Sequence, residues 1–207
     1  ADDIYTFVFK KQAEKEKRQW SLADWLDTRD RMRLQDLWLA LHTPTPYEFF
    51  LSGAYQWLAP GNQGSAWDAS FAAFVTIFGL EFQYESTVNP RVLGLFDLRI
   101  FGFHDQGTNI TLSAGLRGEN GGGESYRNPV AGVRMTIYLM RYFGIEGLYR
   151  YYFPSTPTLS GVNYSGYRLE GGAFLDYKIL RVYGDYFSEM GTLPELKGVR
   201  VGLKLYF

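Results

Sequence analysis

Apolar and polar residues alternate along most of this chain, and the pattern is clearest over its last eleven residues, 197–207. The apolar positions there are Val199, Val201, Leu203, Leu205 and Phe207. The positions between them are Gly198, Arg200, Gly202, Lys204 and Tyr206. A period of two predicts a β-strand with one apolar face and one polar face.

About ten segments after residue 46 share this alternation. We expect strands at 47–57, 66–77, 80–86, 91–103, 108–118, 129–140, 144–153, 165–177, 180–187 and 197–207. A count of eight would follow if 66–86 were one bent strand and another pair were misassigned. Most segments have about nine to thirteen residues, which suits tilted strands that cross a bilayer.

The connections between these segments are predicted to alternate in length. Short turns are expected at 78–79, 104–107, 140–143 and 177–179. Long loops are expected at 59–65, 86–90, 118–128, 154–164 and 188–195. Short turns at one end and long loops at the other are typical of outer-membrane barrels. The pattern predicts a closed antiparallel up-and-down transmembrane β-barrel in 47–207, with both termini in the periplasm.

Residues 1–46 differ from the rest and form a separate predicted segment. Residues 10–42 are rich in charge and poor in Gly and Pro, which predicts a periplasmic helical segment that ends at Thr43-Pro44-Thr45-Pro46. Three uses of this helix remain open: it plugs the barrel mouth, lies on the membrane surface or docks on a partner. The apolar residues expected to make such contacts are Trp20, Leu22, Trp25, Leu26, Leu37 and Trp38.

Composition narrows the class of protein. The net charge is -1, which argues against nucleic acid as a partner. Tyr and Phe number 16 each, an excess that β-strands and aromatic girdles explain. There is no Cys, so disulfides and thiol chemistry are excluded. The chain has no apolar run of about 18 residues, so no transmembrane helix is expected.

The polar faces of the predicted strands carry charges of both signs in nearly equal number. With apolar residues outward, the inward cations are Arg99, Arg117, Arg134, Arg150, Arg168, Arg181, Arg200 and Lys204. The inward acids include Glu48, Asp97, Glu146, Glu170, Asp176 and Asp185, with Asp68, Glu81 and Glu85 in the same phase. Arg forms bidentate pairs with carboxylates, and side chains fill most of a narrow barrel. We therefore expect a lumen crossed by ion pairs.

The end of the chain also carries a recognisable pattern. Arg200, Gly202, Leu205 and Phe207 form the spacing Arg-x-Gly-x-x-Leu-x-Phe. This spacing resembles the C-terminal insertion signal of bacterial outer-membrane β-barrel proteins. The resemblance covers 47–207. It implies location in the outer membrane, contact with lipid and lipopolysaccharide, and recognition by the barrel-assembly machinery during insertion.

Candidate chemistry is sparse. The only histidines, His42 and His104, fall at the end of the predicted helix and in a short turn, with no hydrolase motif around either. We therefore predict no catalytic residues, no metal site and no cofactor. The acids Asp68, Glu85 and Glu124 remain candidates for a pair at the outer rim, although surface acids are ordinary.

These observations favour a non-enzymatic barrel that anchors or scaffolds an envelope assembly. Its helix would dock on a periplasmic or outer-membrane protein partner. Two alternatives stay open: a narrow channel or transporter, and a rim-located enzyme that modifies lipid or cleaves peptides.

Overall fold

The computed structural model describes residues 47–59, 64–87, 89–102, 104–121, 124–155, 163–192 and 195–207. They form ten strands: β1 (Tyr47–Leu58), β2 (Ser65–Val75), β3 (Phe78–Ser86), β4 (Arg91–Phe101), β5 (Asn109–Gly121), β6 (Glu124–Tyr138), β7 (Phe143–Tyr152), β8 (Gly166–Tyr177), β9 (Leu180–Gly191) and β10 (Leu196–Tyr206). The predicted helical segment 1–46, with its contact residues, lies outside the described residues. In the described part of the chain, no helix is long and apolar enough to cross a membrane.

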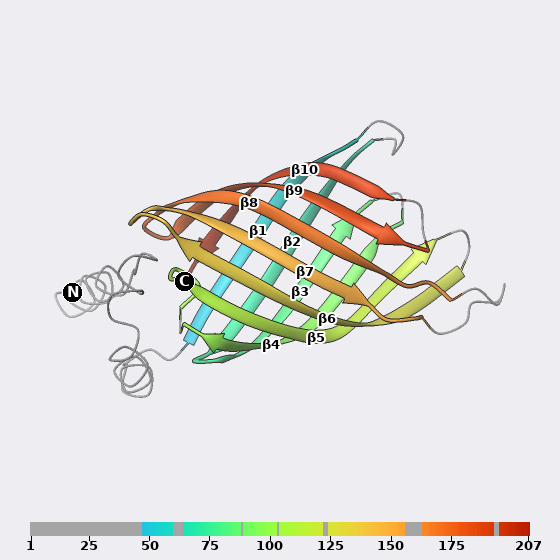
Figure 1. Ribbon diagram of the computed structural model, residues 1–207, viewed down its shortest axis with the longest axis horizontal. Coiled ribbons are helices and arrows are strands. Elements are labelled where there is room, and N and C mark those ends of the chain that lie inside the picture. The colour runs from blue at the N-terminus through green and yellow to red at the C-terminus, as the bar shows by residue number, and fades with distance from the viewer. Residues whose placement is uncertain are drawn as a thin grey trace, which may run out of the picture.

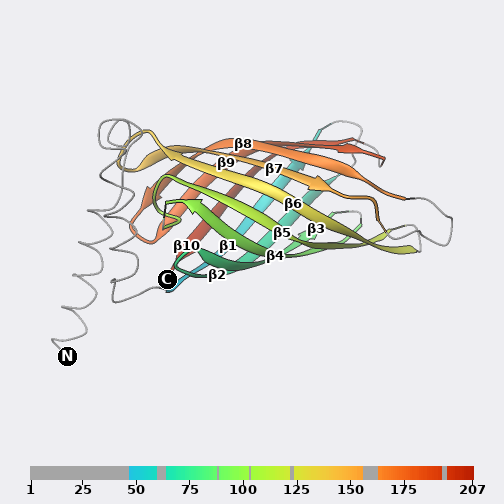
Figure 2. The same ribbon diagram turned by 60° about the horizontal axis from the view of Figure 1, so that its bottom comes forward.

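The ten strands close into one antiparallel barrel (Figure 1). Each strand pairs with its neighbours in sequence, and β1 pairs with β10 to close the ring, with Phe50 opposite Tyr206. The predicted barrel and its count of ten strands are confirmed, and the alternative of eight strands is wrong. The start of β1 and the end of β10 lie at the same end of the barrel, which we call the terminal end; the opposite end is the loop end (Figures 1 and 2).

The two faces of the barrel wall differ as the alternation predicts. Outward residues are large, apolar and exposed, as shown by Leu203 (52% exposed) and Phe82 (56% exposed). Inward residues are buried and mostly polar, and the two largest fully buried side chains are Arg168 and Arg181. A soluble protein has the reverse arrangement. An apolar exterior around a polar interior is the arrangement that hydrocarbon surroundings require.

Several predicted strand ends are wrong. The region 118–128, expected as a long loop, mostly continues the hairpin of β5 and β6, in which Gly121 lies opposite Glu124. The strand expected to end at 187 continues to Gly191. In both places the alternation of inward-facing and outward-facing residues continues through positions that composition alone assigns to a loop. The turn expected at 78–79 is Thr76-Ile77, where Thr76 has a φ of 58°.

The predicted difference in loop length between the two ends is only partly correct. At the loop end, only two residues, 122–123, separate β5 from β6, whereas at the terminal end seven residues, 102–108, separate β4 from β5. That seven-residue connection turns into the lumen, because Asp105 and Gln106 are buried within it. The connection predicted as a short turn at 104–107 therefore places side chains inside the lumen at the terminal end.

Candidate functional site

The lumen is the only place in the described residues where many polar side chains converge, and they form three clusters along its axis. The terminal-end cluster contains Glu48, Arg99, His104, Asp105, Tyr138, Asp176, Arg181, Lys204 and Tyr206. The middle cluster contains Glu81, Gln83, Arg134 and Arg150. The loop-end cluster contains Gln56, Asp68, Glu85, Arg91, Arg117, Glu119, Arg168, Glu170, Asp185, Glu189 and Arg200. All are held on strands except His104 and Asp105, which belong to the 102–108 connection.

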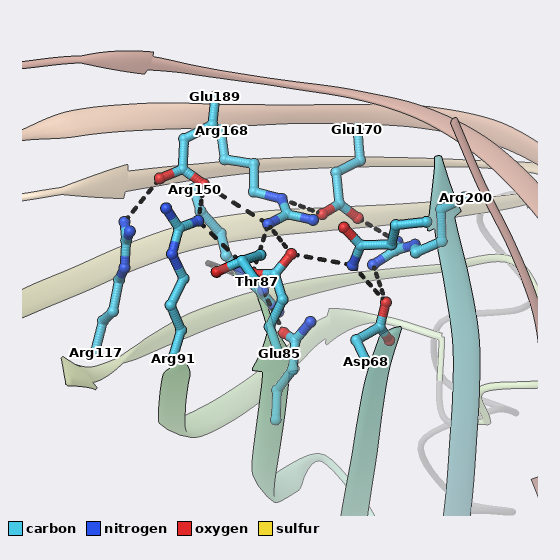
Figure 3. Close-up of polar contacts among 12 residues, drawn as sticks. Asp68, Glu85, Thr87, Arg91, Arg117, Arg150, Arg168, Glu170, Glu189 and Arg200 are labelled. Atoms are coloured by element: carbon cyan, nitrogen blue, oxygen red, sulfur yellow. Dashed lines mark hydrogen bonds and ion pairs between the residues drawn. The ribbon is translucent and has the colours of Figure 1, made fainter. Parts of the chain in front are cut away.

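The loop-end cluster joins opposite walls of the barrel (Figure 3). Arg168 on β8 donates from Nη1 to Glu85 on β3, at 3.1 Å from each carboxylate oxygen. Arg91 on β4 donates from Nη1 to Oε2 of Glu189 on β9 at 2.9 Å. In a ring of ten strands, β3 lies opposite β8 and β4 lies opposite β9. Both ion pairs therefore span the bore.

Further contacts tie this cluster into a continuous network. Arg168 Nε donates to Glu170 at 2.6 Å, and Glu170 also accepts from Arg200 Nη2 at 2.5 Å. Arg200 reaches Asp185 at 2.9 Å. The amide of Gln56 donates to Asp68 at 2.7 Å and to Glu85 at 3.0 Å. Arg117 pairs with Glu119 and, at 3.0 Å, with Glu189.

The middle cluster centres on one carboxylate. Glu81 on β3 accepts from Arg134 on β6 at 2.6 Å and from Arg150 on β7 at 3.1 Å. Arg150 also donates to Gln83 at 2.7 Å. Beside this cluster lies a cavity of about 50 Å³, lined in part by Ser52, Ser70, Glu146, Tyr183 and Lys204. Since one water needs roughly 10–15 Å³ on this measure, the cavity holds only a few waters.

The terminal-end cluster closes the other mouth of the bore. Asp105 accepts hydrogen bonds at Oδ2 from Lys204 Nζ at 2.7 Å and from the Tyr206 hydroxyl at 2.9 Å. Arg181 Nη2 donates to the Asp105 carbonyl at 3.2 Å. Burial by itself raises the pKa of the Asp105 carboxyl, but the positive charges of Lys204, Arg181 and Arg99 outweigh it and hold that pKa well below its usual range. Asp105 is therefore a buried anion.

Two more acids complete this cluster. Glu48 accepts from Arg99 Nη1 at 2.7 Å and lies 2.6 Å from the Nδ1 atom of His104. Asp176 accepts from Arg181 Nε at 2.7 Å and from the Tyr138 hydroxyl. The guanidinium of Arg181 also lies over the ring of Phe174, at 3.9 Å from its centroid. Apolar rings therefore pack against the charges at this end.

The structure places the residues of the predicted lumen network inside the barrel. These are Arg99, Arg117, Arg134, Arg150, Arg168, Arg181, Arg200, Lys204, Glu48, Asp97, Glu146, Glu170, Asp176 and Asp185. Most are paired as described above. Asp97 is 1% exposed and its Oδ2 atom has no hydrogen-bond partner. Glu146 is the most open, at 34% exposure of its side chain, and contacts Arg181 at 3.3 Å.

Four arginines and acids of the three clusters were not predicted: Arg91, Asp105, Glu119 and Glu189. Arg91 shares the odd-numbered phase of Asp97 and Arg99, and Glu119 shares that of Arg117, so parity could have found both. Glu189 falls in a region expected to be a loop. Asp105 is absent from any alternating pattern, because it enters the lumen from a connection.

The four residues of the predicted assembly signal divide between the two faces of β10. Arg200 and Gly202 face the lumen, where the ring of Tyr183 packs so closely on Gly202 that a Cβ there would overlap it. Leu205 and Phe207 face outward and are 36% and 59% exposed. Gly202 therefore has a packing role of its own.

Of the three acids considered for a pair at the outer rim, Asp68 and Glu85 lie within the network, and the side chain of Glu124 lies outside the part that the structure describes. Asp68 and Glu85 are 3% and 1% exposed and are bound by Gln56 and Arg168. His104 contacts Glu48 at the terminal end, while His42 lies outside the described residues. Among the residues that the structure describes, no group of three or more His, Asp or Glu is placed to hold a metal ion.

A closed antiparallel barrel with an apolar outer surface and a charged lumen defines the class of this protein: it is a transmembrane β-barrel. No protein-family model matches the chain, and no curated protein matches it either.

Solved structures do match. The N-terminal β-barrel domain of Pseudomonas aeruginosa OprF matches with 11% identity and a TM-score of 0.40, covering 77% of this chain and 97% of that one. The KdgM porin matches with 15% identity and a TM-score of 0.44, covering 76% and 99%. The translocator domain of the autotransporter NalP from Neisseria meningitidis matches with 12% identity and a TM-score of 0.40, covering 89% and 97%. At such identities and TM-scores a likeness says nothing of activity, so the class rests on the chain's own strands and surfaces.

Proposed function

We propose that this protein is a non-conducting, non-enzymatic barrel of the bacterial outer membrane that serves as a structural anchor in the cell envelope. The observation that carries the proposal is the pair of ionic contacts that span the bore, Arg168 with Glu85 and Arg91 with Glu189. Removing one partner of a buried ion pair leaves an uncompensated charge and costs about 3–5 kcal/mol, so we expect the paired side chains to resist displacement from the bore.

The other two clusters support the same reading. Glu81 joins β3 to β6 and β7 in the middle of the lumen, and Asp105 joins the 102–108 connection to β10 at the terminal end. An ion that crosses the barrel would have to displace all three levels in turn. Ion pairs that link opposite strands across the lumen make the barrel rigid, and a rigid barrel suits a protein that anchors an assembly in the membrane.

Single-channel recording in planar bilayers tests this proposal. We expect the purified wild-type protein to insert and give no resolved conductance steps. A variant that carries Arg91→Ala and Arg168→Ala at the loop end, Glu81→Ala in the middle and Asp105→Ala at the terminal end removes a contact residue at all three levels. We expect this variant to conduct, which shows that insertion occurs under the same conditions. Stable conductance steps from the wild-type protein would overturn the non-conducting assignment.

A narrow channel is the second candidate, and one observation favours it. The cavity of about 50 Å³ lies beside the middle cluster and is lined by charges of both signs. This candidate requires the long arginine side chains at each end to rearrange so that the cavity connects to both mouths. Wild-type conductance that depends on voltage would support this candidate.

The anchoring role needs a partner, and the segment 1–46 is the part of the chain that the barrel does not require. We expect deletion of residues 1–40 to leave a folded barrel that still migrates differently before and after heating. The same deletion should abolish co-purification of a periplasmic or outer-membrane protein from native membranes. If no protein co-purifies with the intact chain, the anchoring role is wrong, even when the barrel shows no conductance in bilayers.

A rim-located enzyme is the third reading, and the anchor proposal predicts that assays for its activity are negative. Cells that express the protein should keep the same lipid A mass and show no new proteolysis at the surface. A change in either would replace the structural role with a catalytic one.

A further inference from the structure

The pairing of β1 with β10, which we call the closing seam, is the one strand pair in the barrel formed by segments far apart in sequence. Phe50 lies opposite Tyr206 and Ser52 opposite Lys204, while every other pair joins strands that follow one another along the chain. Near the terminal end the seam is held by the N–H of Phe207, which donates to the Phe49 carbonyl at 2.8 Å. Joining such distant segments has a larger loop-closure cost than forming a hairpin.

The 102–108 connection contacts both strands of this seam from inside the barrel. On the β1 side, Glu48 lies 2.6 Å from His104 Nδ1 and accepts a hydrogen bond from the Asp105 N–H at 3.3 Å. On the β10 side, Asp105 accepts from Lys204 at 2.7 Å and from Tyr206 at 2.9 Å. One short segment therefore bridges the first and last strands.

The connection starts from the far side of the ring. It joins the end of β4 to the start of β5. Counted around the ring, β4 lies three strands from β1 and six from β10, and β5 lies four strands from β1 and five from β10. To reach the seam it must cross the bore. Gln106 fixes it further by donating to the Lys178 carbonyl in the turn between β8 and β9, at 2.6 Å.

Local structure directs the connection inward. Gly102 has a φ of +73°, and a Cβ at this position would collide with the Thr108 carbonyl. Asn109, which is 0% exposed, donates from Nδ2 to the carbonyls of Gly107 at 2.9 Å and His104 at 3.2 Å. A left-handed glycine and a buried amide thus set the inward path before any contact with the seam.

We propose that residues 104–108 form an internal latch that binds when β1 and β10 have paired and then holds the closing seam shut. The two halves of its binding site, Glu48 and the Lys204–Tyr206 pair, come together only in the closed ring. Closure and sealing of the terminal mouth are therefore one coupled event. This device goes beyond the proposed function and stands whether or not the lumen conducts.

Hydrogen exchange at individual strands tests the latch. In Asp105→Asn, the seam amides of β1 and β10 near the terminal end, including the Phe207 N–H, should exchange about tenfold faster or more, because local opening no longer breaks the ion pair between Asp105 and Lys204. Exchange in the β6–β7 pair should stay unchanged. Faster exchange everywhere would mean simple loss of global stability, and unchanged exchange at the seam would mean that the latch does not hold it; either result overturns the proposal.

A matched control separates the latch from buried charge in general. Glu119→Gln also removes a buried carboxylate charge that binds two arginines, but its partners are Arg91 on β4 and Arg117 on β5, and neither lies on a seam strand. We expect Glu119→Gln to leave exchange at the seam as in the wild type. Faster exchange at the seam in this control would overturn the proposal.

A backbone variant covers the case in which Asp105→Asn does not fold. Gly102→Ala disturbs the inward path and keeps every contact residue. Its control is Gly64→Ala, because Gly64 also has a positive φ, of +112°, but lies at the loop end with nothing within 4 Å of an added Cβ. We expect Gly102→Ala to speed exchange at the terminal end of the seam and Gly64→Ala to leave it unchanged. Equal effects would overturn the proposal.

Discussion

Asp105 and Lys204 meet at 2.7 Å inside the barrel, although 99 residues separate them in sequence. Both are buried, so the ammonium and the carboxylate have little water to replace the contact. A double-mutant cycle of Asp105→Asn and Lys204→Met should therefore give a coupling free energy of roughly 1–3 kcal/mol. Reversible unfolding in urea from lipid vesicles, followed by tryptophan fluorescence, measures each corner of the cycle.

The control cycle pairs Asp105→Asn with Lys197→Met. Lys197 lies near the loop end of β10 and contacts Glu195 at 2.7 Å, well away from the latch. Its coupling with Asp105 should be close to zero. Equal coupling in the two cycles would show that the Asp105–Lys204 contact is not specific.

The lowered pKa of Asp105 predicts how stability changes with pH. Because Lys204, Arg181 and Arg99 favour the charged carboxylate, the folded barrel binds the Asp105 proton less readily than the unfolded chain does. The stability that the Asp105 charge contributes to the folded barrel is therefore fully present above the unfolded pKa of about 3.9 and is lost progressively as the pH falls below that value. The difference in unfolding free energy between wild type and Asp105→Asn should be largest near neutral pH and shrink from about pH 4 downward. A difference that stays constant to about pH 2 would contradict this.

The barrel was predictable from the sequence because alternation reports directly which side chains meet lipid. In β8, Arg168 and Asp176 share one phase while Leu169 and Leu175 share the other, and burial follows that phase. Arg117 and Arg150 were placed in the lumen for the same reason, without any knowledge of their partners.

What the sequence could not supply is which charges meet. Glu85 with Arg168 and Arg91 with Glu189 come from opposite walls, so their pairing depends on how the strands are staggered around the ring. Asp105 was missed for a different reason. Its burial depends on the path of a connection set by Gly102 and Asn109, and a periodic pattern carries no information about such a path.

Arg168 is the residue whose loss should weaken the barrel most at the loop end. It is 2% exposed and binds Glu85 and Glu170, so Arg168→Met leaves two buried carboxylates short of a partner. We expect a loss of about 3–5 kcal/mol in the free energy of unfolding. The exposed Arg127 on β6 provides the comparison, and Arg127→Met should change stability by less than about 0.5 kcal/mol. Similar losses for both variants would show that the charge network adds little stability.

Gly115 should tolerate no side chain, whereas Gly171 should tolerate one. Gly115 lies opposite Leu95 in the β4–β5 pair, and a Cβ there would collide with the Gly94 carbonyl and the Leu95 backbone. Backbone atoms cannot move aside as a flexible side chain can, so Gly115→Ala should cost about 1–3 kcal/mol through overpacking. Gly171 faces outward on β8, with nothing within 4 Å of an added Cβ, so Gly171→Ala should be neutral or slightly stabilising. Urea unfolding of both variants checks this, and equal destabilisation would mean that strand propensity rather than the close approach of β4 and β5 governs these positions.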